Sequence, residues 1–248
     1  MKNSILGSRV DPTSYANALQ QVMTWAERRE SRYVCAANVH MLMEAYDSPE
    51  FQRMVNAADL VTPDGMPLVW TLRWLGFRQQ ERVYGPTLTM HVLESANKEG
   101  IAVGFYGGTP ITLEKLKSNL LMQYPGLNIA YSYAPPFRPL TMEEDEEVTN
   151  KINASEALIL FVGLGCPKQE WWMAAHRGRI QAVMLGVGAA FDFHAGIKPQ
   201  APHWMQRIGL EWLFRLSVEP GRLWRRYLIQ NPRFIYLVLK QFMRGKDG

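Results

Sequence analysis

Short apolar runs rich in β-branched and aromatic residues alternate along the chain with segments of helical periodicity. The apolar runs fall at residues 33–37, 60–62, 101–106, 127–133, 157–162 and 182–187. Helices are expected at residues 15–29, 49–57, 86–98, 109–123, 143–153 and 167–176, and an early proline supports several of these starts. Such alternation is typical of a parallel sheet covered by helices on both faces. The sequence therefore predicts an α/β fold with a doubly wound, mostly parallel sheet.

The character of the sequence changes near Ala201, where large apolar and aromatic residues become interleaved with arginines. This segment is expected to form two or three short helices, broken at Pro220 and again at Pro232. Residues 171–248 carry 12 Lys and Arg against 4 Asp and Glu, whereas residues 1–170 carry 15 against 19. We therefore divide the chain into a body, residues 1–200, and a short, basic, aromatic helical appendage, residues 201–248.

The basic appendage favours an anionic partner, which from the sequence alone is nucleic acid, a diphosphate or an anionic membrane surface. One helical face would carry Trp204, Ile208, Trp212, Leu213 and Leu216. That face suits either docking on the body or lying in a membrane interface with arginines at the headgroups. Both can hold for different halves of the appendage.

Composition excludes several classes of protein. With 248 residues, 47% of them hydrophobic, the chain is long enough for one large domain with a substantial core. The two cysteines, Cys35 and Cys166, are far apart and the five histidines lack metal-ligand spacing, so we expect no disulfide, no metal and no cofactor. Because there is no signal-peptide pattern and no apolar run near the ~20 residues that span a bilayer, we expect a cytoplasmic protein.

Polar residues and glycines directly follow four of the predicted strands. In open α/β sheets, ligands bind at the carboxyl ends of the strands, so these positions are the first candidates for a site. They are Asn38 and His40 after the first strand, Asp64 after the second, Gly107 and Gly108 after the third, and residues 163–169 after the fifth. Four loops are therefore expected to line one crevice.

Two of these loops suit the recognition of phosphate or sugar groups. Gly107 and Gly108 precede a helix start, where backbone N–H groups can approach an anion, although such a turn is also ordinary between a strand and a helix. Lys168, Gln169 and Glu170 lie in the first turn of a later helix. These three polar side chains suit the recognition of a nucleotide or of a sugar hydroxyl. The alternative is a surface lysine and a glutamate that compensates the helix dipole.

Asp64 lies in the stretch VTPDGMPLVW, where an apolar strand stops and an apolar helix begins. Its carboxylate can act as a general base that deprotonates an acceptor hydroxyl for attack on an activated carbon. The alternative is a helix N-cap in a common Asp-Gly turn. Because the chain lacks an Asp-x-Asp motif, charge on a leaving diphosphate would be met by helix N-termini and by the appendage arginines Arg215, Arg222, Arg225 and Arg226.

The stretches ADLVTPDGMPLVW, ERVYGP, GLGCPKQEWW, GVGAAFDFHAG and GLEWLFRLSVEPGRLWRRY together resemble the WecG/TagA/CpsF family of bacterial glycosyltransferases, from about residue 33 to residue 230. The resemblance implies a Rossmann-like body followed by an appendage that helps to complete the active site and contacts the membrane. It also implies transfer of a sugar from a UDP-sugar donor to a polyprenyl-diphosphate-linked sugar, with inversion at the anomeric carbon and no required metal.

The resemblance further implies roles for individual residues. Asp64 matches the catalytic base, and Asn38, Arg82 and Gln169 match polar positions of the active site. Arg215, Arg222 and Arg225 match appendage arginines that hold the diphosphate. The chain departs from the family's pattern at Ala36, His40 and Gln200, around the substrate pocket. The donor sugar therefore stays open, and the N-acetylmannosamine of the best-known members is not assumed.

We expect an inverting, UDP-sugar-dependent hexosyltransferase of cell-surface or exopolysaccharide biosynthesis, peripherally associated with the inner face of the cytoplasmic membrane. Its partners would be the UDP-sugar, a polyprenyl (undecaprenyl)-diphosphate-linked acceptor and the membrane surface, not nucleic acid. Association into a homo-oligomer is left open. Two alternatives also stay open: a non-catalytic peripheral membrane or nucleotide-binding module, and a dinucleotide-dependent oxidoreductase, which the lack of a GxGxxG motif disfavours.

Overall fold

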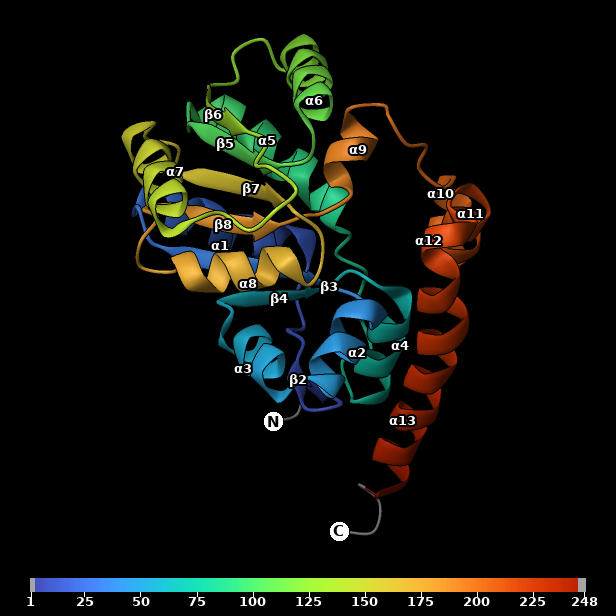
Figure 1. Cartoon of the computed structure of the whole chain (residues 1–248). Coiled ribbons are helices and arrows are strands. Elements are labelled where there is room, and N and C mark those ends of the chain that lie inside the picture. The colour runs from blue at the N-terminus through green and yellow to red at the C-terminus, as the bar shows by residue number, and fades with distance from the viewer. Residues whose placement is uncertain (1–2, 245–248) are drawn as a thin grey trace.

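The computed structural model describes residues 3–244, which form a six-stranded sheet with helices on both faces and a helical appendage along one side (Figure 1). The strands of the sheet are β3 (Arg32–Ala37), β4 (Leu60–Pro63), β5 (Val103–Gly107), β6 (Ile129–Tyr133), β7 (Ile159–Gly163) and β8 (Val183–Gly186). Their order is β4-β3-β8-β7-β5-β6, and every neighbouring pair is parallel. The predicted α/β fold with a doubly wound parallel sheet is confirmed.

The body helices divide between the two faces of the sheet. One face carries α1 (Tyr15–Glu27), α5 (Gly85–Glu99), α6 (Pro110–Gln123) and α9 (Ala190–His194). The other carries α2 (Val39–Asp47), α3 (Pro49–Ala57), α4 (Met66–Trp74), α7 (Met142–Ala154) and α8 (Lys168–His176), with a hairpin of β1 (Ser4–Ile5) and β2 (Ser8–Arg9). Each predicted strand and helix overlaps an observed one. The short hairpin, α2 and α9 were not predicted, since the hairpin strands and α9 are too short for a periodic pattern and only Ser48 separates α2 from α3.

Alternating side chains along the strands divide the interior into two cores. In β3, Tyr33 and Cys35 belong to the core that includes α2 and α3, whereas Val34 between them belongs to the core that includes α1 and α5. Phe161 and Val162 of β7 are divided in the same way. Because both faces are buried, the strands are almost continuously apolar. This is the physical reason that apolar runs identified them.

The carboxyl ends of all six strands lie at one edge of the sheet, since the strands are parallel. β4, the next strand in the sequence, pairs with one edge of β3, and the later strand β8 pairs with its other edge. The strand order therefore reverses at β3. Ligands of open α/β sheets bind outside the carboxyl ends at such a reversal. Asn38 and Asp64 directly follow the two strands concerned.

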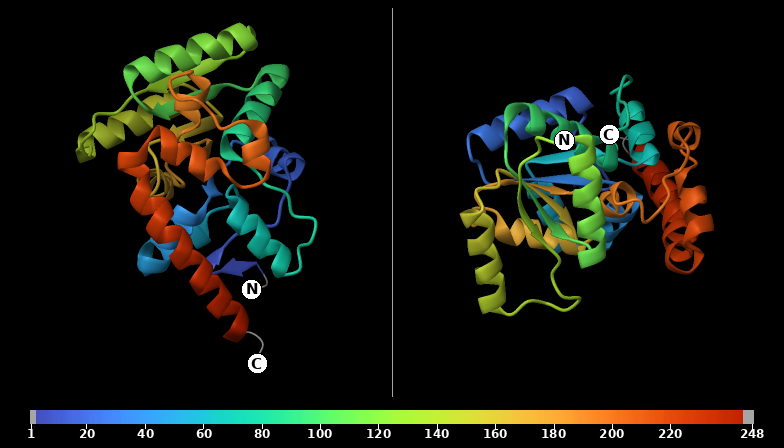
Figure 2. Two further views of the ribbon diagram at one scale, coloured as in Figure 1. Left: turned by 90° about the vertical axis from the view of Figure 1, so that its right-hand side faces the viewer. Right: turned by 90° about the horizontal axis from the view of Figure 1, so that it is seen from above.

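The appendage consists of helices packed along one side of the body (Figure 2). They are α10 (His203–Arg207), α11 (Glu211–Val218), α12 (Pro220–Arg225), a π-helical turn η1 (Arg226–Gln230) and α13 (Asn231–Arg244). Gly209, with φ of +80°, separates α10 from α11, so the apolar stripe predicted on one helical face is split between two helices. Residues 245–248 of the predicted appendage and residues 1–2 of the predicted body lie outside the described residues.

The two predicted helix breaks have different outcomes. The break at Pro220 is confirmed, because α11 ends at Val218 and proline is tolerated in the first turn of α12. The break at Pro232 is wrong, because α12, η1 and α13 follow one another without interruption. A π-helical turn, η1, lies directly before Asn231 and Pro232, so the backbone hydrogen-bond pattern changes near the proline while the helix continues.

The long helix docks on the body through both apolar and polar contacts. Phe234 and Val238 are buried in the core that includes α2 and α3. Gln241 accepts a hydrogen bond from the Leu6 backbone N–H at 2.8 Å and donates to the Ser4 carbonyl oxygen at 3.0 Å. Docking on the body is therefore observed for α13, in the second half of the appendage. Of the apolar stripe predicted in the first half, Trp204, Ile208 and Leu213 are exposed. The status of the appendage as a separate domain stays a prediction. No helix among residues 3–244 is long and apolar enough to cross a membrane.

Candidate active site

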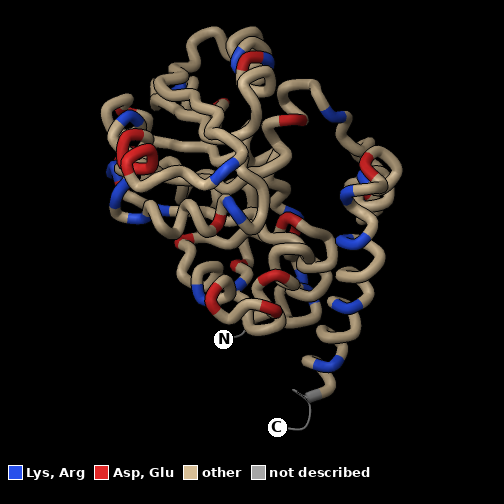
Figure 3. The backbone as a smooth tube through the Cα atoms, in the orientation of Figure 1, with Lys and Arg blue, Asp and Glu red and all other residues tan. Residues whose placement is uncertain are grey.

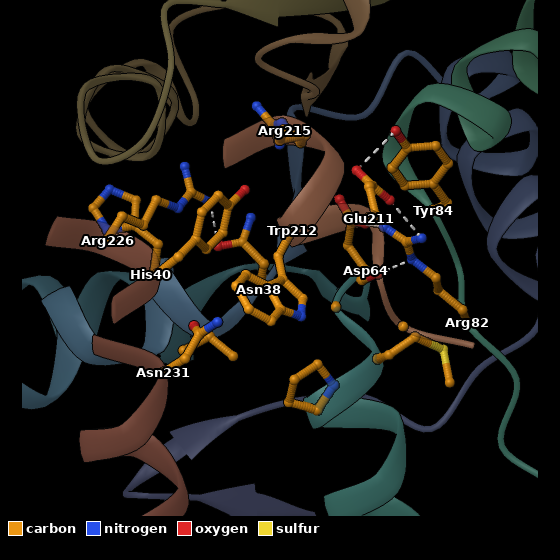
Figure 4. A pocket seen from close by; sticks show the side chains of 16 residues that line it. Asn38, His40, Asp64, Arg82, Tyr84, Glu211, Trp212, Arg215, Arg226 and Asn231 are labelled. Atoms are coloured by element: carbon orange, nitrogen blue, oxygen red, sulfur yellow. Dashed lines mark hydrogen bonds and ion pairs between the residues drawn. The ribbon is translucent and has the colours of Figure 1, made fainter. Parts of the chain in front are cut away.

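A cavity that opens to solvent lies between the body and the appendage, at the carboxyl edge of the sheet (Figure 4). Its walls come from the loops after β3 and β4, the segment before α5, and the appendage elements α11 and η1. Its charged and polar lining includes Asn38, His40, Asp64, Arg82, Glu211, Arg215 and Arg226. The structure thus brings Asn38, Asp64, Arg82 and Arg215 of the predicted site together.

Asp64 follows β4, and its backbone N–H donates to the Ala37 carbonyl oxygen at 2.8 Å, which ties this loop to β3. Gly65 occupies the N-cap position of α4, and that helix has no side-chain cap. The carboxylate of Asp64, 14% exposed, instead lies against Arg82, with 3.0 Å between Oδ1 and Nη2. The N-cap alternative for Asp64 is therefore not what the structure shows.

Arg82 connects Asp64 to the appendage. Its Nε donates to the backbone carbonyl oxygen of Asp64. On its other side, Nη1 lies 2.7 Å from Oε2 of Glu211, the first residue of α11. The guanidinium lies over the Tyr84 ring, 4.0 Å from its centroid, and the Tyr84 hydroxyl donates to Oε1 of Glu211 at 3.2 Å. One largely buried arginine is therefore shared between two carboxylates from distant parts of the chain.

Burial raises the pKa of Asp64 to about 6. The positive charge of Arg82 opposes this rise by favouring the carboxylate, whereas the negative charge of Glu211 adds to it. A carboxyl group with this pKa is mostly ionised at neutral pH and still has a useful affinity for a proton. Both properties are those of a general base.

Two arginines of the appendage, Arg215 and Arg226, face the cavity. Nη2 of Arg226 donates to Oδ1 of Asn38 at 3.1 Å, and the same oxygen caps α2 by accepting from the Met41 backbone N–H. Arg215 lies 5.7 Å from the centroid of the Phe193 ring. Within residues 3–244 neither guanidinium takes part in an ion pair, and burial lowers the pKa of Arg226. Two positive charges without carboxylates favour an anion in this cavity.

Gly107 ends β5 and Gly108 directly follows it, and neither residue lines the cavity. Gly107 has φ of +123°, and a Cβ there would lie 2.6 Å from the carbonyl carbon of Gly163, so only glycine fits. The backbone N–H of Gly108 donates to the Gly163 carbonyl oxygen at 3.1 Å. Both glycines therefore have a structural role where β5 meets β7, and phosphate binding by them stays a prediction.

Lys168 and Gln169 also lie outside the lining of the cavity. Gln169 is buried: its Oε1 accepts from the Gly165 backbone N–H at 3.2 Å, and its Nε2 donates to Oε1 of Glu170 at 2.8 Å. Lys168 is exposed at the start of α8. Contact of either residue with a substrate stays a prediction.

The other two predicted arginines of the appendage point elsewhere. Arg222 pairs with Glu219 at 2.5 Å, and the guanidinium of Arg225 lies 5.3 Å from the centroid of the Trp224 ring. Both residues are exposed and absent from the cavity lining, so their contact with a diphosphate stays a prediction. Among residues 3–244 there is no group of three or more His, Cys, Asp or Glu side chains that could hold a metal ion.

Sequence reasoning missed Glu211 and Tyr84. Both lie inside stretches that carry the family resemblance, GLEWLFRL and ERVYGP, but neither has a local pattern that identifies its contact. One signal was available: Glu211 is one of only two acidic residues between positions 201 and 244, a segment rich in arginine. An isolated acid among arginines within an apolar helix is a candidate for a specific charge partner.

Glu170 is a second buried carboxyl group near the carboxyl edge. It is 1% exposed, and its Oε2 has no hydrogen-bond partner among the described residues. Burial raises the pKa of Glu170 to about 7, although hydrogen bonds from Gln169 and Cys166 act in the opposite direction. At neutral and alkaline pH the fold therefore holds a buried, incompletely hydrogen-bonded negative charge.

Comparison with known proteins identifies a family. The family described as "Glycosyl transferase WecG/TagA/CpsF family" matches residues 3–248. A protein of Bacillus spizizenii named N-acetylglucosaminyldiphosphoundecaprenol N-acetyl-beta-D-mannosaminyltransferase is 31% identical over 229 residues, which cover 92% of this chain and 86% of that protein. A protein of the same name from Staphylococcus aureus is 27% identical over 242 residues, covering 96% of this chain and 92% of that protein.

Replacing Glu170 by glutamine should stabilise the protein at alkaline pH. In the unfolded chain the pKa of a glutamate is about 4.3, below the value of about 7 for Glu170 in the folded protein. The free energy of unfolding therefore decreases as pH rises from about 4.3 through about 7. Glu170→Gln should therefore raise the free energy of unfolding at pH 8.5 by roughly 1–3 kcal/mol and change it little at pH 4.5. Urea unfolding at both pH values measures this.

The matched control is Glu146→Gln, because Glu146 is an exposed residue of α7. It should change stability equally little at both pH values. A Glu170→Gln protein that is no more stable than the wild type at pH 8.5 would show that the buried carboxylate carries no such cost.

Proposed function

The chain belongs to the WecG/TagA/CpsF family of glycosyltransferases, and we propose that it transfers N-acetylmannosamine from a UDP-linked donor to N-acetylglucosaminyl-diphospho-undecaprenol, a lipid-linked precursor of a bacterial cell-envelope polymer. The acceptor and the transferred sugar are those in the names of the two relatives. Family membership removes the oxidoreductase alternative and the non-catalytic module. The observation that carries the proposal is Asp64, a carboxylate with a pKa of about 6, facing a cavity that also presents two arginines which make no ion pair within residues 3–244.

Asp64 acts in this proposal as the general base. The acceptor hydroxyl oxygen forms a bond to the anomeric carbon of N-acetylmannosamine while the bond from that carbon to UDP breaks. The hydroxyl proton passes to Asp64, and the bonding electrons leave on the diphosphate of UDP. Attack from the face opposite UDP inverts the anomeric configuration, which agrees with the beta linkage in the names of the relatives. Proton removal by a positioned base typically contributes about 10²- to 10⁴-fold to the rate.

Arg215 and Arg226 act as the cationic partners of a diphosphate. They come from α11 and η1, so the appendage supplies the positive charge and the body supplies the base. A planar guanidinium binds phosphate oxygens through paired N–H donors, and burial strengthens the interaction because little water competes. The diphosphate is either that of the leaving UDP or that of the lipid-linked acceptor. The nucleotide is proposed to lie further along the carboxyl edge, towards Gly107, Gly108, Lys168 and Gln169.

The appendage also presents an apolar surface that we assign to the membrane. Exposed residues recur at spacings of four or seven along α12, η1 and α13, which places them on one side of the long helix: Trp224, Leu228, Ile235, Leu239 and Met243. Lysines and arginines lie along the same helix (Figure 3). An apolar stripe flanked by basic side chains suits the interface of an anionic bilayer, where the lipid-linked acceptor resides.

Replacing Asp64 by asparagine should abolish transfer without damaging the fold. Asn keeps the shape but cannot accept the proton, so kcat should fall by about 10²- to 10⁴-fold. The midpoint of thermal unfolding should stay the same or rise, because a buried carboxylate with a raised pKa is removed. Release of UDP in the presence of a lipid-linked acceptor measures kcat. Turnover near the wild-type rate would remove Asp64 from the mechanism.

Replacing Arg226 by glutamine should weaken transfer by about 10²- to 10³-fold in kcat/KM, the usual loss for one well-placed donor to developing charge. The matched control is Arg233→Gln, which removes the same charge from α13, where the exposed Arg233 pairs with Asp47 at 2.6 Å. With a short-chain, water-soluble acceptor, the control should stay within a few-fold of the wild type. Equal losses in both variants would show that total charge matters and the cavity position does not.

Replacing Ile235 by glutamate should release the protein from vesicles that contain anionic phospholipid. Ile235 is 56% exposed on the apolar side of α13, and a carboxylate there opposes both burial in the interface and attraction to anionic headgroups. Ile111→Glu on α6, where the side chain is 64% exposed, is the control and should still float with the vesicles. If both variants float as well as the wild type, this surface is not the membrane contact.

A further inference from the structure

Glu211 is the acidic residue that the appendage turns toward the body. Between residues 201 and 244 the chain has two carboxylates, and the other, Glu219, pairs with Arg222 and Lys198 away from the cavity. The carboxylate of Glu211 is 11% exposed, and it meets Arg82 and Tyr84 on the body side of the cavity. Burying a carboxylate is costly, and a hydrophobic contact would dock α11 at lower cost. The position of Glu211 therefore calls for a role other than docking.

We propose that Glu211 is a positioning residue for Asp64: through the shared guanidinium of Arg82, it fixes the orientation of that carboxylate and increases its basicity when the appendage is docked. The proposal rests on the proposed function, in which Asp64 is the general base. It adds a residue of the appendage that acts on the base and does not touch the reacting sugar.

The geometry supports the orienting part of this role. The guanidinium of Arg82 is held at three nitrogen atoms, with Nε on the backbone carbonyl oxygen of Asp64, Nη2 on its carboxylate, and Nη1 on Glu211. The Tyr84 ring lies against its face. Because the guanidinium is rigid and planar, fixing one edge with Glu211 and one face with Tyr84 fixes the direction of the edge that meets Asp64.

Electrostatics support the second part. Asp64, Arg82 and Glu211 together hold two negative charges and one positive charge at a largely buried site. The negative charge of Glu211 repels the carboxylate of Asp64 and so offsets part of the attraction of Arg82, which favours the protonated form of Asp64. The other titratable and charged groups that line this cavity or act on Asp64 are Tyr15 of α1, His40 of α2, Tyr84 before α5, and Arg215, Arg226 and Tyr227 of the appendage.

It follows that the strength of the base depends on the appendage. With α11 docked, the guanidinium of Arg82 contacts two carboxylates, and Asp64 has the higher proton affinity that a base needs near neutral pH. With α11 displaced, the full charge of Arg82 would act on Asp64, which would then be a weaker base. Proton removal would thus be most effective when Arg215 and Arg226 are also in place.

The test compares Glu211→Gln with the wild type in two measurements. Glutamine retains an oxygen that can accept from Arg82 but carries no charge. The titration of Asp64 is followed directly by carbon NMR of protein labelled at the aspartate carboxyl, with Asp64 assigned as the signal lost in Asp64→Asn. The pH dependence of kcat/KM for sugar transfer is recorded in parallel. The control is Glu219→Gln, which removes the same charge from the same appendage outside the cavity.

In Glu211→Gln, both the carboxyl titration of Asp64 and the acid limb of kcat/KM should move to lower pH by roughly 0.5–1 unit, the direction expected when a nearby negative charge is lost. At pH 8, kcat/KM should fall by about 3- to 30-fold, because the base is weaker and less well oriented. Glu219→Gln should move neither curve.

An unmoved carboxyl titration in Glu211→Gln, or an equal shift in Glu219→Gln, would overturn the proposal. A shifted titration with an unmoved acid limb would also overturn it, because Glu211 would then not act on the catalytic step. If the wild type transfers no sugar, the proposed function fails, while the NMR titration still decides whether Glu211 sets the proton affinity of Asp64.

Discussion

The guanidinium of Arg82, held between the carboxylates of Asp64 and Glu211, is the interaction on which the rest of the site depends. Asp64 belongs to the loop after β4 and Glu211 to the first turn of α11, so this one group joins the body to the appendage at the wall of the cavity. Two carboxylates and one guanidinium leave a net negative charge at a buried site. Such a charge is unfavourable for stability and useful for proton transfer. Such local conflict is expected where chemistry takes place.

The body and the appendage contribute different groups to the site. The parallel sheet fixes the carboxyl ends of β3 and β4 side by side, and the hydrogen bond from the Asp64 backbone N–H to the Ala37 carbonyl oxygen holds the proposed base against the sheet. The appendage supplies positive charge through Arg215 and Arg226 and docks through Phe234 and Val238. In the proposed reaction, a base fixed on the body and a charge cluster carried by the appendage suit an enzyme that receives one water-soluble substrate and one lipid-linked substrate.

Much of the fold was predictable, and the site only in part. Strands buried on both faces appear as apolar runs, which is why all six were located, and the parallel sheet then placed Asn38 and Asp64 together. The Glu211–Arg82 contact was not predictable, because no local pattern encodes a pairing between residues so far apart in sequence. Gly107, Gly108 and Gln169 show the converse: their patterns suit a ligand, yet their observed contacts are with neighbouring backbone and side chains. The continuity of the long helix through Pro232 was missed because a π-helical turn leaves no signature in composition.

A double-mutant cycle on Arg82 and Glu211 tests the central claim most directly, that this pair acts as one unit linking the appendage to the catalytic base. The values of kcat/KM for transfer are measured for the wild type, Arg82→Gln, Glu211→Gln and the double variant. The account predicts that the double variant is much less impaired than the product of the two single losses, with a coupling free energy of about 1–3 kcal/mol. Single losses that simply multiply in the double variant would contradict it.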